Sequence, residues 1–97
     1  MFNNPRNITC GISVEIPVEI QMMMWLMVDA LKESGKKIDY LQVFSLCVQG
    51  EKQKIIHSQE KPKYKNETVI EAANPVSAKV FVIDDGIYST MLLADEY

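Results

Sequence analysis

The stretch PVEIQMMMWLMVDALKESG, residues 17–35, decides the fold, because it predicts the one long helix of the chain. Pro17 suits the first turn of a helix, where its missing N–H is no loss, and Glu19 suits the positive end of the helix dipole. Gly35 is well placed as a C-terminal cap, with lysines directly after it. These signals predict an amphipathic helix over residues 17–34.

The predicted helix carries more apolar surface than one buried side needs. One stripe at helical spacing should pack on a sheet, and it consists of Ile20, Met23, Met24, Met27, Val28 and Leu31. A second stripe lies on the opposite, polar side and consists of Val18, Met22, Trp25 and Leu26. Burying the second stripe is worth about 6–12 kcal/mol gross. Two explanations therefore remain for the second stripe. The chain itself covers it, through residues 60–77 or the N-terminal segment, or a partner protein or a second copy binds it.

The sequence around the helix predicts strands. Apolar and polar residues alternate over residues 8–16, as in a half-buried strand. Residues 40–48 and 53–59 are typical of a hairpin that turns around Gly50. Residues 60–77 have weak periodicity and are expected to form a long loop, with a short strand or helical turn at 68–72 as an option.

A second hairpin is predicted near the C-terminus. Residues 79–84 and 87–94 are apolar segments joined by Asp85-Gly86, a dipeptide that suits a two-residue type I′ turn. One helix with five strands arranged as hairpins does not fit an alternating βαβ pattern. We therefore expect an α+β fold, a two-layer sandwich in which one amphipathic helix packs on a mainly antiparallel sheet of about five strands.

Composition sets limits on the class of protein. The chain has 97 residues, of which 47% are hydrophobic and 24% charged, so we expect a single domain, residues 1–97, that folds alone. A net charge of −3 argues against attraction of the whole chain to nucleic acid or anionic membrane. The longest apolar run, residues 22–28, is far below the ~20 residues needed to span a bilayer, and the N-terminal residues do not resemble a signal peptide. These features favour a soluble, cytoplasmic protein without membrane contact.

Few residues suggest chemistry. Cys10 and Cys47 are expected to be free, buried thiols. Cys47 and His57 could in principle form a nucleophile and base, but a turn at residues 50–51 would place His57 opposite Phe44 and Cys47 opposite Lys54, on different faces of the sheet. One histidine and two distant cysteines do not supply clustered metal ligands, and no glycine-rich phosphate loop is present. We expect no enzyme activity, no cofactor and no catalytic or metal-binding residue.

Charge is unevenly distributed along the chain. Residues 50–66 are locally basic, whereas residues 67–97 are locally acidic. A nucleic acid could contact the basic segment through phosphates and a stacked base, at Lys52, Lys54, Lys61, Lys63, Tyr64 and Lys65. Lysines that protect a strand edge from aggregation explain the same residues.

Several segments resemble a family of short bacterial proteins that is classed only as a domain of unknown function. The segments are IPVEIQ (16–21) with Trp25, DYLQVF (39–44), QKIIHSQE (53–60), FVIDDG (81–86) and STMLLADEY (89–97). Some members of that family are encoded on mobile chromosomal cassettes, near site-specific recombinase genes and beside a separate small inhibitor of uracil-DNA glycosylase. The resemblance implies an accessory role in a mobile element and supplies no site residues. Cys10 departs from it, since an arginine is expected there.

Together these features predict a non-enzymatic accessory module that acts through protein–protein interaction. The predicted contact residues are those of the second helix stripe, Val18, Met22, Trp25 and Leu26, and the partner is an unknown protein or a second copy. The alternative is a weak nucleic-acid-binding accessory protein that uses the basic segment.

Overall fold

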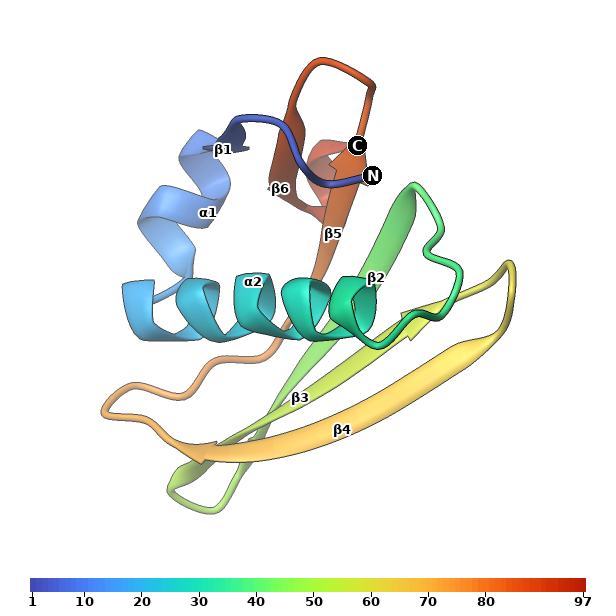
Figure 1. Cartoon of the computed structure of the whole chain (residues 1–97). Coiled ribbons are helices and arrows are strands. Elements are labelled where there is room, and N and C mark those ends of the chain that lie inside the picture. Colours follow the sequence, from blue (N-terminus) through green and yellow to red (C-terminus); the bar gives the residue numbers. More distant parts are fainter.

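The computed structural model describes all 97 residues and places one long helix, α2 (Val18–Glu33), across one face of a six-stranded sheet (Figure 1). The predicted helix is confirmed, with Pro17 before it as the N-cap and Gly35 after it at a φ of +80°. The strand order is β1-β6-β5-β2-β3-β4, and every neighbouring pair except β1–β6 is antiparallel. The predicted α+β fold is therefore confirmed, with six strands instead of about five.

The central hairpin is formed by β2 (Leu41–Gln49) and β3 (Lys52–Gln59). Its turn contains Gly50 at a φ of +62°, a conformation that suits glycine. Phe44 pairs with His57 and Cys47 with Lys54, so the predicted register is confirmed. Cys47 and His57 consequently belong to opposite faces of the sheet.

The predicted loop over residues 60–77 is wrong over residues 64–71, where the strand is longer than the optional short one at 68–72. Residues Tyr64–Glu71 form a full strand, β4, which pairs with β3 along its whole length and lies at the edge of the sheet. Its side chains on the helix side include Asn66 and Thr68, so the hydrophobic alternation that marks a half-buried strand is weak there. Pairing with β3, not burial, specifies this strand.

The C-terminal hairpin consists of β5 (Ala78–Asp84) and β6 (Ser89–Leu93). The predicted two-residue turn is wrong, because Asp84 pairs with Ser89 and four residues lie between them. The Asp85 carboxylate accepts hydrogen bonds from the N–H groups of Ile87 at 2.9 Å and Tyr88 at 2.8 Å. This side-chain turn keeps residues 87 and 88 out of the predicted strand 87–94.

The largest error concerns the predicted strand 8–16. The chain forms only a short strand there, β1 (Arg6–Ile8), and then a helix, α1 (Cys10–Glu15). Ile12 and Ile16 are buried, and a spacing of four fits a helix as well as a strand. Thr9 caps the helix by accepting the N–H of Ile12 at 3.3 Å, so local hydrogen bonding overrides the alternation.

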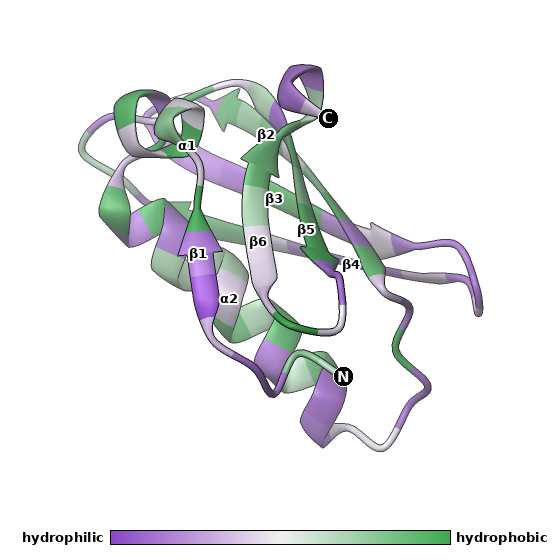
Figure 2. Ribbon diagram, turned by 90° about the horizontal axis from the view of Figure 1, so that it is seen from above, coloured by the Kyte–Doolittle hydropathy of each residue, from purple (hydrophilic) through white to green (hydrophobic).

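The core lies between α2, α1 and the inner face of the sheet. Fourteen buried residues form one hydrophobic cluster. In the hydropathy view of Figure 2, β5 and the end of β6 are hydrophobic, whereas much of β1 is hydrophilic. A short 3-10 helix, η1 (Ala94–Glu96), ends the chain, and its Glu96 accepts hydrogen bonds from the Thr9 hydroxyl at 2.6 Å and the Leu93 N–H at 2.8 Å. Both bonds lower the pKa of Glu96, and the one from Thr9 joins the N-terminal part of the chain to its C-terminal part.

Neither α1 nor α2 is long and apolar enough to cross a membrane.

Candidate interaction surface

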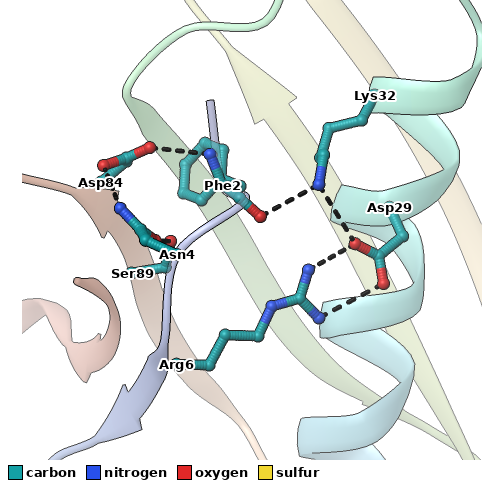
Figure 3. A network of polar contacts seen from close by, with 7 residues as sticks. All are labelled: Phe2, Asn4, Arg6, Asp29, Lys32, Asp84 and Ser89. Carbon is teal, nitrogen blue, oxygen red and sulfur yellow. Dashed lines mark hydrogen bonds and ion pairs between the residues drawn. The ribbon is translucent and has the colours of Figure 1, made fainter. Parts of the chain in front are cut away.

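One flank of α2 is held by the N-terminal segment (Figure 3). The Arg6 guanidinium lies 4.7 Å from the ring centroid of Trp25 and forms an ion pair with both oxygens of Asp29. Lys32 donates from Nζ to the Phe2 carbonyl at 3.0 Å. Since cations pack well on aromatic faces, Arg6 partly covers the Trp25 ring. This flank is closed by the chain itself.

Asp84 anchors the start of the same segment. Its carboxylate accepts the Phe2 N–H at 2.7 Å and the Asn4 side-chain amide at 3.0 Å. The hydrogen bond from Phe2, followed by those from Gly86 and Asn4, lowers the pKa of Asp84. The Phe2 side chain is buried in the core, so the N-terminal residues are fixed by both packing and hydrogen bonds.

The outer side of α2 is open to solvent. Val18, Met22 and Leu26 are 64%, 60% and 59% exposed, and we call these three residues the outer row. The sequence left two segments of the chain as possible covers for this side. Residues 64–71 of the first segment form β4 at the sheet edge instead, and the N-terminal segment reaches Trp25. The four predicted contact residues therefore separate into an exposed row and a partly covered tryptophan.

The second flank of α2 borders a hollow of about 480 Å³ that separates it from β4. Met23, Leu26, Met27 and Ala30 form its helix side, and Asn66 and Thr68 form its strand side. Asp29 and Glu33 add two carboxylates, and no lysine or arginine lines it. We call this hollow the α2–β4 groove. Leu26 belongs to both the outer row and the groove.

The groove runs beside a free strand edge. β4 pairs only with β3, and no loop or side chain makes a hydrogen bond to the backbone of Tyr64–Glu71. Half of the N–H and C=O groups of an edge strand point away from its neighbour. Sequence reasoning missed this edge because it missed β4, and it assigned Met23 and Met27 to the core alone.

His57 is a structural residue of the core. Its side chain is fully buried and stacks on Phe44, with ring centroids 4.4 Å apart. Its Nε2 lies 2.6 Å from Oε1 of Gln42, which can only accept, so Nε2 carries the proton. Burial lowers the pKa of His57 to about 4, which keeps the ring neutral near pH 7.

A buried amide network surrounds His57. The Gln42 amide donates to Oε1 of Gln59 at 2.8 Å, and Gln59 donates to the Lys37 carbonyl at 3.0 Å. Each of these glutamines thus finds partners inside the sandwich. The network fixes the approach of the loop after α2 to β3. It contains no nucleophile.

The structure divides the predicted nucleic-acid residues. Lys52 and Lys54 form ion pairs with Glu71 and Glu67 of β4, at 3.6 and 3.5 Å. The Tyr64 ring packs edge-on against His57 and lies 5.2 Å from the Lys36 ammonium. Lys61, Lys63 and Lys65 are exposed at the other end of the β3–β4 hairpin. The segment is therefore not one continuous basic surface, and the nucleic-acid alternative stays a prediction.

The remaining candidate side chains are the two cysteines and the possible metal ligands. Cys10 and Cys47 are free, as predicted, but Cys10 is exposed and Cys47 is partly exposed, so the expectation that both are buried is wrong. No three His, Cys, Asp or Glu side chains gather as a metal site would require.

Residues 5–96 match the model of a family described as "Staphylococcal protein of unknown function (DUF960)". The chain belongs to this family. The predicted resemblance to a domain of unknown function is thereby confirmed.

A solved structure shares the fold of this family member. It is the crystal structure of a protein of unknown function from Enterococcus faecalis, with a TM-score of 0.79 and 24% sequence identity. The similarity covers 98% of this chain and 92% of the other. None of the curated proteins matches the chain.

Proposed function

We propose that this protein is a non-enzymatic interaction module that docks a protein partner on the outer side of α2. The observation that carries the proposal is the outer row itself: Val18, Met22 and Leu26 are each more than half exposed on the long helix. Large apolar side chains that line up on one helix face mark interaction sites more often than scattered ones do. Methionine adapts its shape readily, which suits docking.

The chemistry of the remaining molecule supports the same proposal. The single histidine is buried and hydrogen-bonded to Gln42, so it cannot reach a substrate. None of the hollows in the surface holds a nucleophile hydrogen-bonded to a base. An accessory role in a cytoplasmic pathway, and in a mobile element in particular, belongs to this proposal as its biological setting.

The test compares two double variants that leave the net charge unchanged. Val18→Glu with Met22→Lys replaces two of the three residues of the outer row and places a favourable Glu–Lys pair four residues apart. Val14→Glu with Ile87→Lys is the matched control, because both residues are exposed and apolar but belong to other parts of the chain, α1 and the β5–β6 turn. Affinity capture from a host extract, followed by titration with each purified partner, measures binding. We expect at least a tenfold loss for the first variant and none for the control; equal binding by both would refute the proposal.

A further inference from the structure

The β4 edge lacks most of the features that protect sheet edges from pairing. It is eight residues long, contains no proline, and pairs with β3 without a bulge from Lys52↔Glu71 to Gln59↔Tyr64. The residues that face the helix layer at its centre, Asn66 and Thr68, are uncharged. Natural edges are normally short, bulged, blocked by an inward-pointing charge or lined with charged side chains. Of these features β4 has only the last, because Lys65, Glu67 and Glu71 alternate with Asn66 and Thr68 and so lie on the face away from the helix layer. A strand can therefore add to β4 without steric or charge conflict on the helix side.

The groove supplies what a bare edge lacks, namely pockets for side chains. Figure 1 shows β4 at the edge of the sheet below α2. Met23, Leu26, Met27 and Ala30 line the hollow between these two elements. An extended peptide on β4 would direct every second side chain into that space. Backbone hydrogen bonds would then give affinity, and the groove would give specificity.

Charge indicates which peptide fits. Glu33 forms no ion pair, and Asp29 is already paired with Arg6 and Lys32. Since no cation lines the groove, a lysine or arginine near Glu33 is the complementary side chain. Met23 and Glu33 lie about 15 Å apart along the helix axis, which equals four to five residues of an extended chain.

We propose that β4 and the α2–β4 groove bind an extended peptide segment of a partner protein, which adds to the sheet as a strand next to β4. The segment carries apolar side chains at alternate positions and a basic residue at the end near Glu33. This inference rests on the proposed function as an interaction module and names the chemistry of its partner. It concerns the flank of α2 that faces β4, whereas the earlier test concerns the outer row.

The experiment uses a random library of ten-residue peptides displayed on phage and selected on the full chain. A selected peptide is then synthesised with each backbone nitrogen methylated in turn. Strand addition predicts that methylation at every second position weakens binding at least tenfold, whereas the positions between tolerate it, because only alternate N–H groups face β4. Amide hydrogen exchange should slow in Tyr64–Glu71 when the peptide is bound.

A pair of charge variants tests the predicted orientation. Glu33→Lys should weaken the selected peptide about fivefold or more, which corresponds to about 1 kcal/mol. Glu51→Lys makes the same charge change at an exposed, unpaired residue in the β2–β3 turn and should leave affinity unchanged. Equal effects of the two variants would contradict the placement of the basic residue.

Three other outcomes would overturn the proposal. No enriched peptide would mean that the edge does not bind extended segments. Uniform sensitivity to methylation, with NMR shifts confined to α2, would replace strand addition by docking on the helix and leave the proposed function standing. Protection of Tyr64–Glu71 in a dimer of the free protein would assign the edge to a second copy. In the first of these cases, loss of partner capture in the Val18→Glu, Met22→Lys variant would overturn the strand addition alone and leave the proposed function standing.

Discussion

The two edges of the sheet contrast with each other. At one edge, β1 is three residues long and the segment that leads into it is tied to α2 and to the β5–β6 end by Arg6, Phe2 and Asn4. At the other edge, β4 is eight residues long and makes no hydrogen bond outside its pairing with β3. One helix, α2, borders both edges: its Trp25 flank is covered, and its Met23 flank is open. Side-chain contacts therefore cover the β1 edge, whereas the backbone of the β4 edge is free to pair with another strand.

The largest expected effect comes from releasing the N-terminal segment from the β1 edge. Phe2→Ala removes a side chain that is 1% exposed and should lower the free energy of unfolding by about 3–5 kcal/mol, the usual cost of deleting a buried aromatic ring. Urea unfolding measures the change, and hydrogen exchange should show faster exchange in β1. Ile87→Ala is the control, because Ile87 is largely exposed and its replacement should change stability by less than about 0.5 kcal/mol. A small effect of Phe2→Ala would mean that the N-terminal segment does not hold the edge.

A change of pH tests the packing beside the β4 edge, because His57 of β3 pairs with Asn66 of β4. Burial lowers the pKa of His57 from 6.5 to about 4, so the unfolded chain binds more protons between these values. The free energy of unfolding should therefore be highest above pH 6.5 and fall by about 2–3 kcal/mol on acidification to pH 4.5. Urea titrations at a series of pH values test this.

The control for that pH dependence is His57→Gln, which retains a donor for Gln42 and cannot titrate in this range. Its stability should be nearly flat from pH 6.5 to 4.5. Asp84, whose pKa is lowered, contributes stability that is lost only at lower pH, as its carboxylate becomes protonated below its ordinary value of 3.8. A wild-type profile as flat as that of His57→Gln would contradict the assignment.

The smallest expected effect is that of the ion pair at the closed edge. A double-mutant cycle of Arg6→Ala and Asp29→Ala should give a coupling of about 0.2–1 kcal/mol, since both side chains are partly exposed, and the two-point geometry favours the upper end. Arg6→Ala should also shift Trp25 emission to the red, because the guanidinium shields that ring. Lys32→Ala is the comparison, since Lys32 contacts the same segment without touching Trp25 in this way. An unchanged emission maximum in Arg6→Ala would show that the ring is covered by other groups.

Sequence reasoning succeeded where one element carries its own signals. The α2 helix has a proline at its start, a glycine at its end and an apolar stripe between them, and the β2–β3 hairpin has a glycine turn that fixes its register. Sequence reasoning failed where the apolar spacing fits both a helix and a strand, and where a strand has few buried side chains. Ile12 and Ile16 satisfy both strand and helix spacing, and β4 lacks a continuous apolar face. The exposed outer row follows from helix geometry, but the groove required the position of β4.

The sequence by itself determined the α+β class, the long helix, the register of the central hairpin and the family to which the chain belongs, because short-range signals and apolar periodicity specify these features. Only the tertiary structure decided which side of α2 each sheet edge occupies. Arg6 reaches Trp25, and Asn66 and Thr68 face Met23 across a hollow, through contacts between residues far apart in the chain. Such contacts depend on strand order, and no local pattern in the sequence encodes strand order.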